Sequence, residues 1–374
     1  MKPITWKKIL AISTLSGTTI GVGIFSLPYV AARVGFGLTM LYLAVLAVLV
    51  TLVHLSFSEV ALKTPDFLRL PGYAGLHLGD WGRKAAIAVA ILGSVGTLLV
   101  YIIIGGSFLG NLLLPFLGGS IFLYTILYFI LGVFFIFWGI KAIAKIEFWG
   151  LVLFLFSLLV IFWRGFPFFE IRNLSFGFSD GFGDLFLPYG LVLFSLWGAT
   201  MIPEIEEMLG RDKKAIKKVV TIASIIPVVI YLLFIVLIVL ISGSATSREA
   251  ILGLKNILGP KVISIMFLAG FLTTFTSFIT IGLTLKKVFW YDLKIPHYFS
   301  WVLTCFLPFL LYILGFQDSI KIVGLVGGAM LALEAVLILL MYKKIKQGKA
   351  RFFVYPLIVV FLIGIIYEIV YFLR

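Results

Sequence analysis

Long apolar runs constrain this chain more than any other feature. A bilayer core of about 30 Å needs roughly 20 apolar residues per helix, and eleven such runs can be found in the sequence. They cover residues 9–32, 37–62, 85–114, 121–140, 147–163, 184–208, 219–242, 261–288, 298–314, 320–342 and 352–373. With 62% apolar and 12% charged residues, 374 residues cannot hide this surface in a soluble core. The runs also lack the alternation of barrel strands. The sequence therefore predicts an all-α polytopic membrane protein.

The positions of the basic residues predict the orientation of the chain. If the N-terminus lies in the cytoplasm, 22 of the 30 Lys and Arg residues fall in cytoplasmic segments and 8 in outer ones. This bias favours eleven spans in the plasma (inner) membrane, with the N-terminus inside and the C-terminus outside. The net charge of +14 then reflects cytoplasmic loops next to membrane lipid, and we expect no nucleic-acid partner.

Several classes of protein do not fit this composition. Cys305 is the only cysteine, and the three histidines lie far apart without ligand spacing. No nucleotide-binding signature is present, and the spans lack a convergent set of His, Asp and Glu residues. We therefore expect no cofactor and no enzymatic activity. The sequence does not fix the oligomeric state, although a monomer is plausible.

Two long loops suggest an internal repeat. Residues 63–84 follow the second span and residues 243–260 follow the seventh, which puts the loops five spans apart and on opposite sides of the membrane. This layout is expected of inverted repeats. We predict a first repeat over 1–165, a second over 166–345, and an appended eleventh span within 346–374.

The first span contains a segment that is poorly suited to a continuous helix. Between Gly17 and Pro28 it has three glycines and two threonines. In a bilayer, an interrupted helix survives only where it lines a cavity inside the protein. Its freed N–H groups attract an anion and its freed carbonyls attract a cation. The alternative is a packing face of small residues, with the Gly-x-x-x-Gly pattern of Gly17 and Gly21.

The sixth and eighth spans carry matching signals. The sixth has Gly and Ser at its centre and a proline near each end, at Pro188 and Pro203. Paired interrupted spans in the two halves indicate a transporter site. The eighth span presents Thr273, Thr276 and Ser277 on one helix face, where hydroxyl oxygens suit a small hard cation.

These three segments resemble those of the amino acid/auxin permease family, within the amino acid–polyamine–organocation superfamily. The bacterial aromatic amino acid permeases and the sodium-coupled neutral amino acid transporters belong nearby. The resemblance rests on residues 17–28, on 193–203 and on 276–283. It implies the fold of the bacterial leucine transporter, with five plus five inverted helices, helices 1 and 6 broken, and alternating access.

The resemblance also implies two sets of site residues. The substrate carboxylate would meet the N–H groups of Val22 and Gly23, and the ammonium would meet carbonyls in both broken helices. The full substrate set is Thr18, Thr19, Gly21, Val22, Gly23, Tyr101, Phe194, Ser195 and Trp197. A sodium ion would lie between the first and eighth helices at Gly17, Ile20, Thr273, Thr276 and Ser277.

We expect a secondary active symporter of a small neutral amino acid. Trp197 to Thr200 replace a more polar family sequence, which argues against an aromatic substrate. Proton-coupled members of the superfamily can place a lysine in the fifth helix where sodium would otherwise sit. The middle of the fifth span has no lysine here, so the resemblance favours sodium. The alternatives are a proton-coupled aromatic amino acid permease with Glu334 as proton carrier, an exchanger, or a channel.

Other acidic residues in or near the spans have simpler interpretations. Glu368 stands six residues from the C-terminus and is expected to reach the outer headgroups. Glu204, Glu206 and Glu207 follow the sixth span, and we expect them to cluster with Arg211, Lys213 and Lys214.

The orientation can be tested by cysteine labelling of intact cells, with Cys305 replaced by serine. The charge bias predicts that an impermeant reagent added outside labels a cysteine at Ser247 and misses one at Lys214. The reverse pattern would overturn the orientation and the argument for inverted repeats together.

Overall fold

The protein is built from helices throughout the part that the structure describes. The computed structural model describes residues 6–64, 67–139, 143–174, 185–346 and 352–372. The first half contains α1 (Trp6–Thr19), η1 (Val22–Ser26), α2 (Leu27–Val34), α3 (Phe36–Lys63), α4 (Leu70–Leu78), α5 (Asp80–Leu117), α6 (Ile121–Trp138), α7 (Ile143–Gly165), η2 (Phe166–Phe168) and η3 (Ile171–Asn173).

The second half follows the same pattern of long helices and short turns. It contains α8 (Leu187–Leu196), η4 (Ala199–Met201), α9 (Ile202–Leu209), α10 (Lys213–Ser242), η5 (Gly243–Ala245), η6 (Leu252–Leu254), α11 (Lys255–Leu258), α12 (Pro260–Lys287), η7 (Val288–Asp292), α13 (His297–Ile313), α14 (Ser319–Leu325), η8 (Val326–Leu331), α15 (Ala332–Ile345) and α16 (Val354–Phe372). Of the turns, η7 and η8 are π-helical and the others are 3₁₀.

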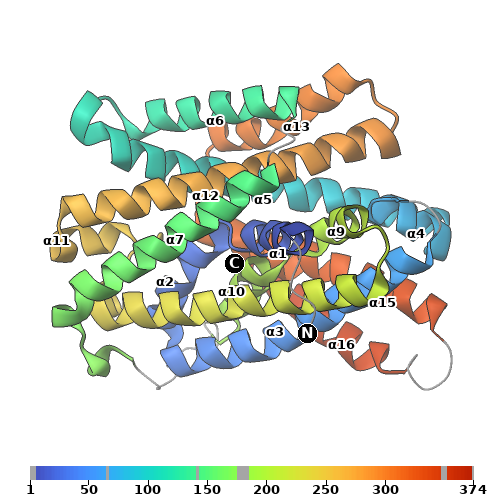
Figure 1. Ribbon diagram of the computed structural model, residues 1–374, viewed down its shortest axis with the longest axis horizontal. Helices are drawn as coiled ribbons and strands as arrows, with labels where there is room; N and C mark the ends of the chain where they lie inside the picture. Colours follow the sequence, from blue (N-terminus) through green and yellow to red (C-terminus); the bar gives the residue numbers. More distant parts are fainter. Residues whose placement is uncertain (1–5, 65–66, 140–142, 175–184, 347–351, 373–374) are drawn as a thin grey trace.

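The long helices run side by side along one direction, as Figure 1 shows. In this view α6 and α13 lie along one side of the bundle, α3 and α16 lie along the other, and α1 sits between them. The short helices α4 and α11 lie at opposite ends of the bundle (Figure 1). α4 lies in the first long loop and α11 in the second. The two loops are therefore at opposite ends of the bundle, as expected when an odd number of spans separates them.

Eight helices of the described residues are long and apolar enough to cross a membrane, or nine if α1 and α2 form one bent span. Two of the eleven predicted spans correspond to shorter elements. One is α13, with 17 residues, and the other is the succession of α8, η4 and α9. The exact count of eleven stays a prediction.

The first helix ends where the glycine-rich segment begins. Regular α-helix stops at Thr19 and resumes at Leu27, and the axes of Trp6–Thr19 and Val22–Val34 differ by 42°. Gly21, between them, has φ −95° and ψ −144°, outside the helical region. Pro28 stands in the first turn of α2, where its missing N–H costs no hydrogen bond.

The second interruption separates α8 from α9. Trp197 is extended, with φ −78° and ψ 123°, and Gly198 follows with φ −140°. Pro203 stands in the first turn of α9. The two interruptions are close in space, because α8 packs against both η1 and α2.

Glu368 differs from its sequence-based expectation. It is buried, at 3% exposure, and lies in a notch formed by Gly190 on α8 and by Gly324 and Gly328 on the segment before α15. A side chain at any of these glycines would approach the Glu368 carboxyl. The expectation of headgroup contact was wrong because the missing side chains of three glycines make room for the carboxyl inside the protein.

Candidate functional site

A tyrosine hydroxyl connects the two interruptions. Tyr231 on α10 is fully buried, and its hydroxyl lies 2.7 Å from the Thr19 carbonyl oxygen and 2.6 Å from the Ser195 carbonyl oxygen. A phenol has one proton, so it donates to one carbonyl at a time. The family resemblance implies that both carbonyls belong to the set that would meet the substrate ammonium. Each carbonyl oxygen therefore keeps at least one lone pair that the Tyr231 hydroxyl does not use.

A buried histidine holds the second interruption in place. The Gly198 N–H donates to His54 Nε2 at 3.2 Å, and His54 Nδ1 lies 3.0 Å from Ser224 Oγ. Because Nε2 accepts, the ring proton belongs on Nδ1, which donates to Ser224. A side chain at position 198 would collide with Thr19 Oγ1. From the sequence alone His54 has no assigned role, although a lone histidine in an apolar span is a signal for one.

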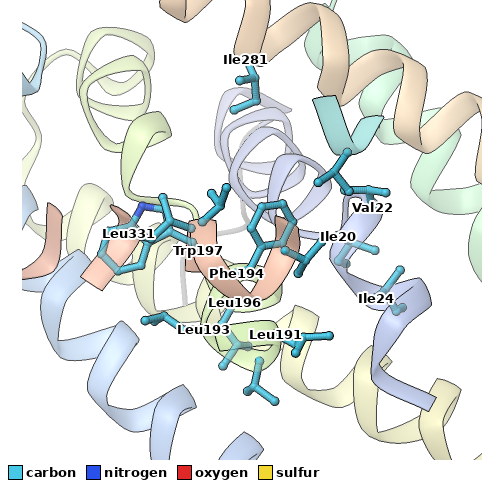
Figure 2. Close-up of a cluster of buried hydrophobic side chains, with 14 of the residues drawn as sticks. Ile20, Val22, Ile24, Leu191, Leu193, Phe194, Leu196, Trp197, Ile281 and Leu331 are labelled. Carbon is cyan, nitrogen blue, oxygen red and sulfur yellow. The ribbon is translucent and has the colours of Figure 1, made fainter. Parts of the chain in front are cut away.

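A cavity lies beside the interruptions, and most of the expected substrate residues line it. Eight of the nine are Thr18, Thr19, Gly21, Val22, Gly23, Tyr101, Phe194 and Trp197. Figure 2 shows the Phe194 ring between Trp197 on one side and Ile20 and Val22 on the other. The cavity is about 70 Å³ in volume. Ser195 is the exception, because its hydroxyl donates to the Leu191 carbonyl within α8 at 2.7 Å.

The glycines of the first interruption allow close contacts between helices. A methyl group at Gly21 would collide with the Tyr101 hydroxyl, and one at Gly23 would come within 3.0 Å of Ser195 and Phe194. These positions are therefore needed for packing between η1, α5 and α8. Direct contact between a ligand and the backbone at Gly23 stays a prediction.

A carboxyl group lines the same cavity. Glu334, at the start of α15, is 3% exposed and accepts a hydrogen bond from Trp197 Nε1 at 3.1 Å through Oε2. Its other oxygen, Oε1, has no hydrogen-bond partner among the described residues. A buried polar atom without a partner costs about 1–3 kcal/mol. Glu334 therefore offers the cavity one unused hydrogen-bonding position.

The expected cation-binding residues lie on α1 and α12, which are in contact. Thr273 and Thr276 are buried, and their hydroxyls donate to α12 carbonyls, with Thr276 bonded to the Thr273 carbonyl at 3.1 Å. Ser277 Oγ is buried and makes no hydrogen bond within the described part of the chain. Gly17 lies in the last turn of α1 and Ile20 follows its end, so both would contribute backbone carbonyl oxygens to the expected site.

Glu147 on α7 reaches the same place, and the sequence analysis missed it. Its carboxyl is 2% exposed. Thr18 Oγ1 donates to Oε1 at 3.1 Å, and Thr280 Oγ1 lies 3.0 Å from the same oxygen and 3.0 Å from the Thr276 carbonyl oxygen, to either of which its one proton can be donated. A methyl group at Gly17 would lie 3.3 Å from Glu147 Cβ, so the glutamate stem runs along α1. The signal was an acidic residue at the first position of a predicted span, where it could be mistaken for an interfacial one.

Charged groups meet where the cavity approaches α4. Arg69 lines the cavity and pairs with Glu204 at 2.7 Å and Glu207 at 3.0 Å, while Lys287 pairs with Glu204 at 2.9 Å. Burial lowers the pKa of the Arg69 guanidinium, but the carboxylates of Glu204 and Glu207 outweigh burial and raise it above its ordinary value.

The expected acidic cluster is only partly observed. Glu206 pairs with Arg211 at 3.3 Å, but Lys213 and Lys214 form no ion pair among the residues described here. Instead Glu204 and Glu207 turn toward Arg69 in the loop before α4. That loop is far away in the sequence, so its basic partner could not be read from local spacing.

Comparisons with known proteins bear on the family and on the fold. The profile of the tryptophan/tyrosine permease family matches residues 5–371. Tyrosine-specific transport system 1 of Haemophilus influenzae is 33% identical over 116 residues, which are 30% of this chain and 29% of that relative. The crystal structure of MhsT in complex with L-phenylalanine superposes with a TM-score of 0.69 over 98% of both chains, at 14% identity. This last likeness shows a shared fold.

The close contact at Gly21 can be tested by a double-mutant cycle. Gly21→Ala should destabilise the protein by about 1–3 kcal/mol, because its methyl group meets the Tyr101 hydroxyl. Tyr101→Phe removes that oxygen, so the double variant should melt at a higher temperature than Gly21→Ala alone. The measurement is thermal unfolding in detergent.

Gly150→Ala is the matched control, because no atom lies within 4 Å of the added methyl group there. We expect its melting temperature to match or exceed that of the parent protein. Strictly additive effects of Gly21→Ala and Tyr101→Phe would contradict the packing described.

Proposed function

The chain belongs to the tryptophan/tyrosine permease family, and on this basis we propose that it carries an amino acid with an aromatic side chain across a membrane by secondary active transport. The family is one of permeases, so the chain is classed with transporters and not with enzymes. Its match to the tyrosine transporter of Haemophilus influenzae spans only 29% of that relative. The substrate is therefore argued from the site.

The observation that carries the proposal is the composition of the cavity. Apolar and aromatic side chains, several hydroxyl groups and Arg69 line the space beside the two interrupted helices, and one carboxyl oxygen of the lining residue Glu334, Oε1, is buried without a partner among the described residues. Indole and phenol groups combine a large apolar ring with one hydrogen-bond donor. A tyrosine or tryptophan side chain would stack among Tyr101, Phe194 and Trp197 and donate to Glu334. Phenylalanine would fill the same space but leave Oε1 without a partner.

The backbone of the substrate has matching groups at the interruptions. We place its carboxylate at the N–H groups of Val22 and Gly23, where the first helix restarts. Its ammonium would lie at the carbonyls of Thr19 and Ser195, in competition with the Tyr231 hydroxyl. Phe194 supplies a third carbonyl at the end of α8.

An aromatic substrate requires the cavity to widen. An apolar cavity of about 150 Å³ binds benzene, whereas the volume of this cavity is about 70 Å³. Movement of Phe194 and Trp197 would supply the space. From the sequence, the less polar residues Trp197 to Thr200 argue against an aromatic substrate; in the structure the Trp197 N–H donates to Glu334 and Trp197 lines the cavity, so polar groups are still present there.

The architecture proposed for this function keeps the layout expected from the sequence. It has eleven spans, with inverted repeats over 1–165 and 166–345 and a further span within 346–374, in the plasma membrane. The N-terminus is placed in the cytoplasm and the C-terminus outside. The cavity extends from the interruptions toward Arg69 and α4. We therefore propose that it is the cytoplasmic side of the substrate pathway in an alternating-access cycle.

Transport against a gradient requires a coupling ion. We propose that a monovalent cation, sodium or a proton, is bound between α1 and α12. The oxygen atoms of Gly17, Ile20, Thr273, Thr276 and Ser277 support a cation there, and the Glu147 carboxyl adds a negative charge beside them.

The substrate class is tested by uptake of labelled amino acids into proteoliposomes. Tyrosine and tryptophan should be taken up in preference to phenylalanine. In Glu334→Leu, the ratio of tyrosine to phenylalanine affinity should fall by roughly 10–150-fold, because a hydrogen bond to a charged acceptor contributes about 1.5–3 kcal/mol. The ratio is the useful measure, since the variant also leaves Trp197 Nε1 without its acceptor.

Glu334→Gln is the matched control, because its amide oxygen still accepts a hydrogen bond and should preserve much of the preference. Uptake of alanine or leucine in place of aromatic amino acids would instead favour the small neutral substrate expected from the sequence. Preferential uptake of lysine or arginine would indicate that Glu334 pairs with a cationic side chain.

A further inference from the structure

The first turns of α10 carry a cluster of lysines on the exposed face of the helix. The α10 lysine cluster consists of Lys213, Lys214, Lys217 and Lys218, whose side chains are all exposed. All but Lys213 line a surface hollow of about 420 Å³, together with Thr221 and Ile222. Within the part of the chain that the structure describes, no member of the cluster forms an ion pair.

The cluster is unfavourable for the helix that carries it. Its four members form two pairs that stand four residues apart, where like charges repel each other. The positive end of the helix dipole also disfavours cations in the first turn. Asp212 already caps the helix, because its Oδ1 accepts from the N–H groups of Lys214 and Ala215. The lysines therefore lower the stability of this helix start, and an anion bound outside the protein would offset their repulsion.

The same face of α10 continues as an apolar surface. Ile225, Val229, Leu232 and Leu233 are exposed and follow the cluster at helical spacing. The opposite face is buried throughout, at residues such as Ala223, Pro227, Ile230, Phe234 and Ile238. The helix is long and apolar enough to cross a membrane. The exposed face should therefore contact lipid, with the lysine cluster at the end where the helix leaves the hydrocarbon.

The spacing along the helix matches one leaflet of a bilayer. Half of a hydrocarbon core of about 30 Å is about 15 Å, which corresponds to roughly ten residues of α-helix. Counted from Ile222, which lines the hollow, this length ends at Leu232. A phosphate held by the cluster lies about one helical turn beyond Ile222. Acyl chains attached to that phosphate would follow Ile225 and Val229.

We propose that this face of α10 is a binding site for an anionic phospholipid, with the phosphate at the lysine cluster and the acyl chains against Ile225 and Val229. A free phosphate would satisfy the lysines but has nothing to place against the apolar face. A zwitterionic phospholipid has no net charge to offset the repulsion. In the proposed orientation the lipid belongs to the cytoplasmic leaflet, whose negative surface attracts basic segments next to a span.

The buried face of the same helix holds the interrupted helices in place. Tyr231 meets the carbonyls of Thr19 and Ser195, and Ser224 lies 3.0 Å from His54 Nδ1. A ligand that binds only the folded protein stabilises it by mass action. Because α10 supplies these contacts, the bound lipid should raise the melting temperature of the whole protein. The inference goes beyond the proposed transport function and does not depend on the substrate.

The test measures lipid binding to the purified full chain in detergent, with dioleoyl phosphatidylglycerol as the probe and dioleoyl phosphatidylcholine as the neutral reference. Phosphatidylglycerol should stay attached in native mass spectrometry and raise the melting temperature, whereas phosphatidylcholine should do neither. In the triple variant Lys214→Gln, Lys217→Gln and Lys218→Gln, the affinity for phosphatidylglycerol should fall by roughly 100-fold. Each lysine near an anionic headgroup strengthens binding by roughly fivefold.

Two matched triple variants separate this site from a general effect of charge. Arginine at the same three positions keeps the charge and should keep the binding. Glutamine at Lys84, Lys294 and Lys344 removes as much charge from exposed lysines elsewhere and should leave binding close to that of the parent protein. Equal losses in the two glutamine variants would overturn the site, because net charge alone would then attract the lipid.

A structural role of the lysines gives a different result. Without added lipid, the glutamine variant of the cluster should melt at or above the temperature of the parent protein, because the repulsion between lysines is relieved. If it melts at a lower temperature and still gains as much stability from phosphatidylglycerol as the parent does, the lysines are structural and the proposal is overturned.

The apolar half of the site distinguishes a lipid from other occupants. Dihexanoyl phosphatidylglycerol has the same headgroup, but its chains are too short to cover the face as far as Val229, so it should bind roughly tenfold or more weakly. Inorganic phosphate that displaces the long-chain lipid at equal concentration would indicate a site for free anions and overturn the proposal. A face that seats a second copy of the chain would show dimers that change in the glutamine variant while lipid retention does not, which would also overturn it. No readout uses an amino acid substrate, so the outcome is independent of the proposed function.

Discussion

Hydrogen bonding of freed backbone groups is the constraint on which the site depends. A helix that stops inside a membrane exposes N–H and C=O groups that lipid cannot satisfy. Here Tyr231 from α10 meets the carbonyls of Thr19 and Ser195, and His54 from α3 accepts from the Gly198 N–H. These partners come from neighbouring helices, so the interruptions exist only in the assembled bundle. The cavity beside them follows from the same arrangement, because extended backbone leaves room that a helical turn would fill.

Three buried glutamates show how the surroundings determine what a carboxyl group can do. Glu368 is enclosed by the glycines of α8 and of the segment before α15, which makes it a packing element. Glu334 lines the cavity, is held by Trp197 on one oxygen, and has no partner on the other among the described residues. Glu147 has two hydroxyls within hydrogen-bond distance of one oxygen and, in the part of the chain that the structure describes, no partner on the other. The same side chain thus packs between helices in one place and keeps an unpartnered oxygen in two others, where we propose roles in substrate selection and in cation binding.

The sequence was most informative where the signal was local. The glycines and proline of the first span predicted a segment unfit for regular helix, and α1 does end at Thr19. The expected substrate residues, apart from Ser195, line one cavity. The missed groups act across the bundle: Tyr231, His54 and Glu147 each contact backbone or side chains more than a hundred residues away. Glu147 was also hidden by its position at the edge of an apolar run, where hydropathy alone cannot distinguish a buried acid from an interfacial one.

The proposed substrate site and the proposed cation site are linked by one residue, Thr18. A ligand shifts an equilibrium only by its difference in affinity between two states, so coupling needs a group that both ligands contact or displace. Thr18 is such a group, because its residue faces the cavity while its hydroxyl bonds to Glu147. A single shared hydrogen bond to a charged carboxylate contributes about 1.5–3 kcal/mol, which is within the usual range of coupling free energies between sites. One threonine at the end of the first interrupted helix would therefore be sufficient to make the binding of the proposed coupling cation and of the substrate interdependent, without a long relay through the bundle.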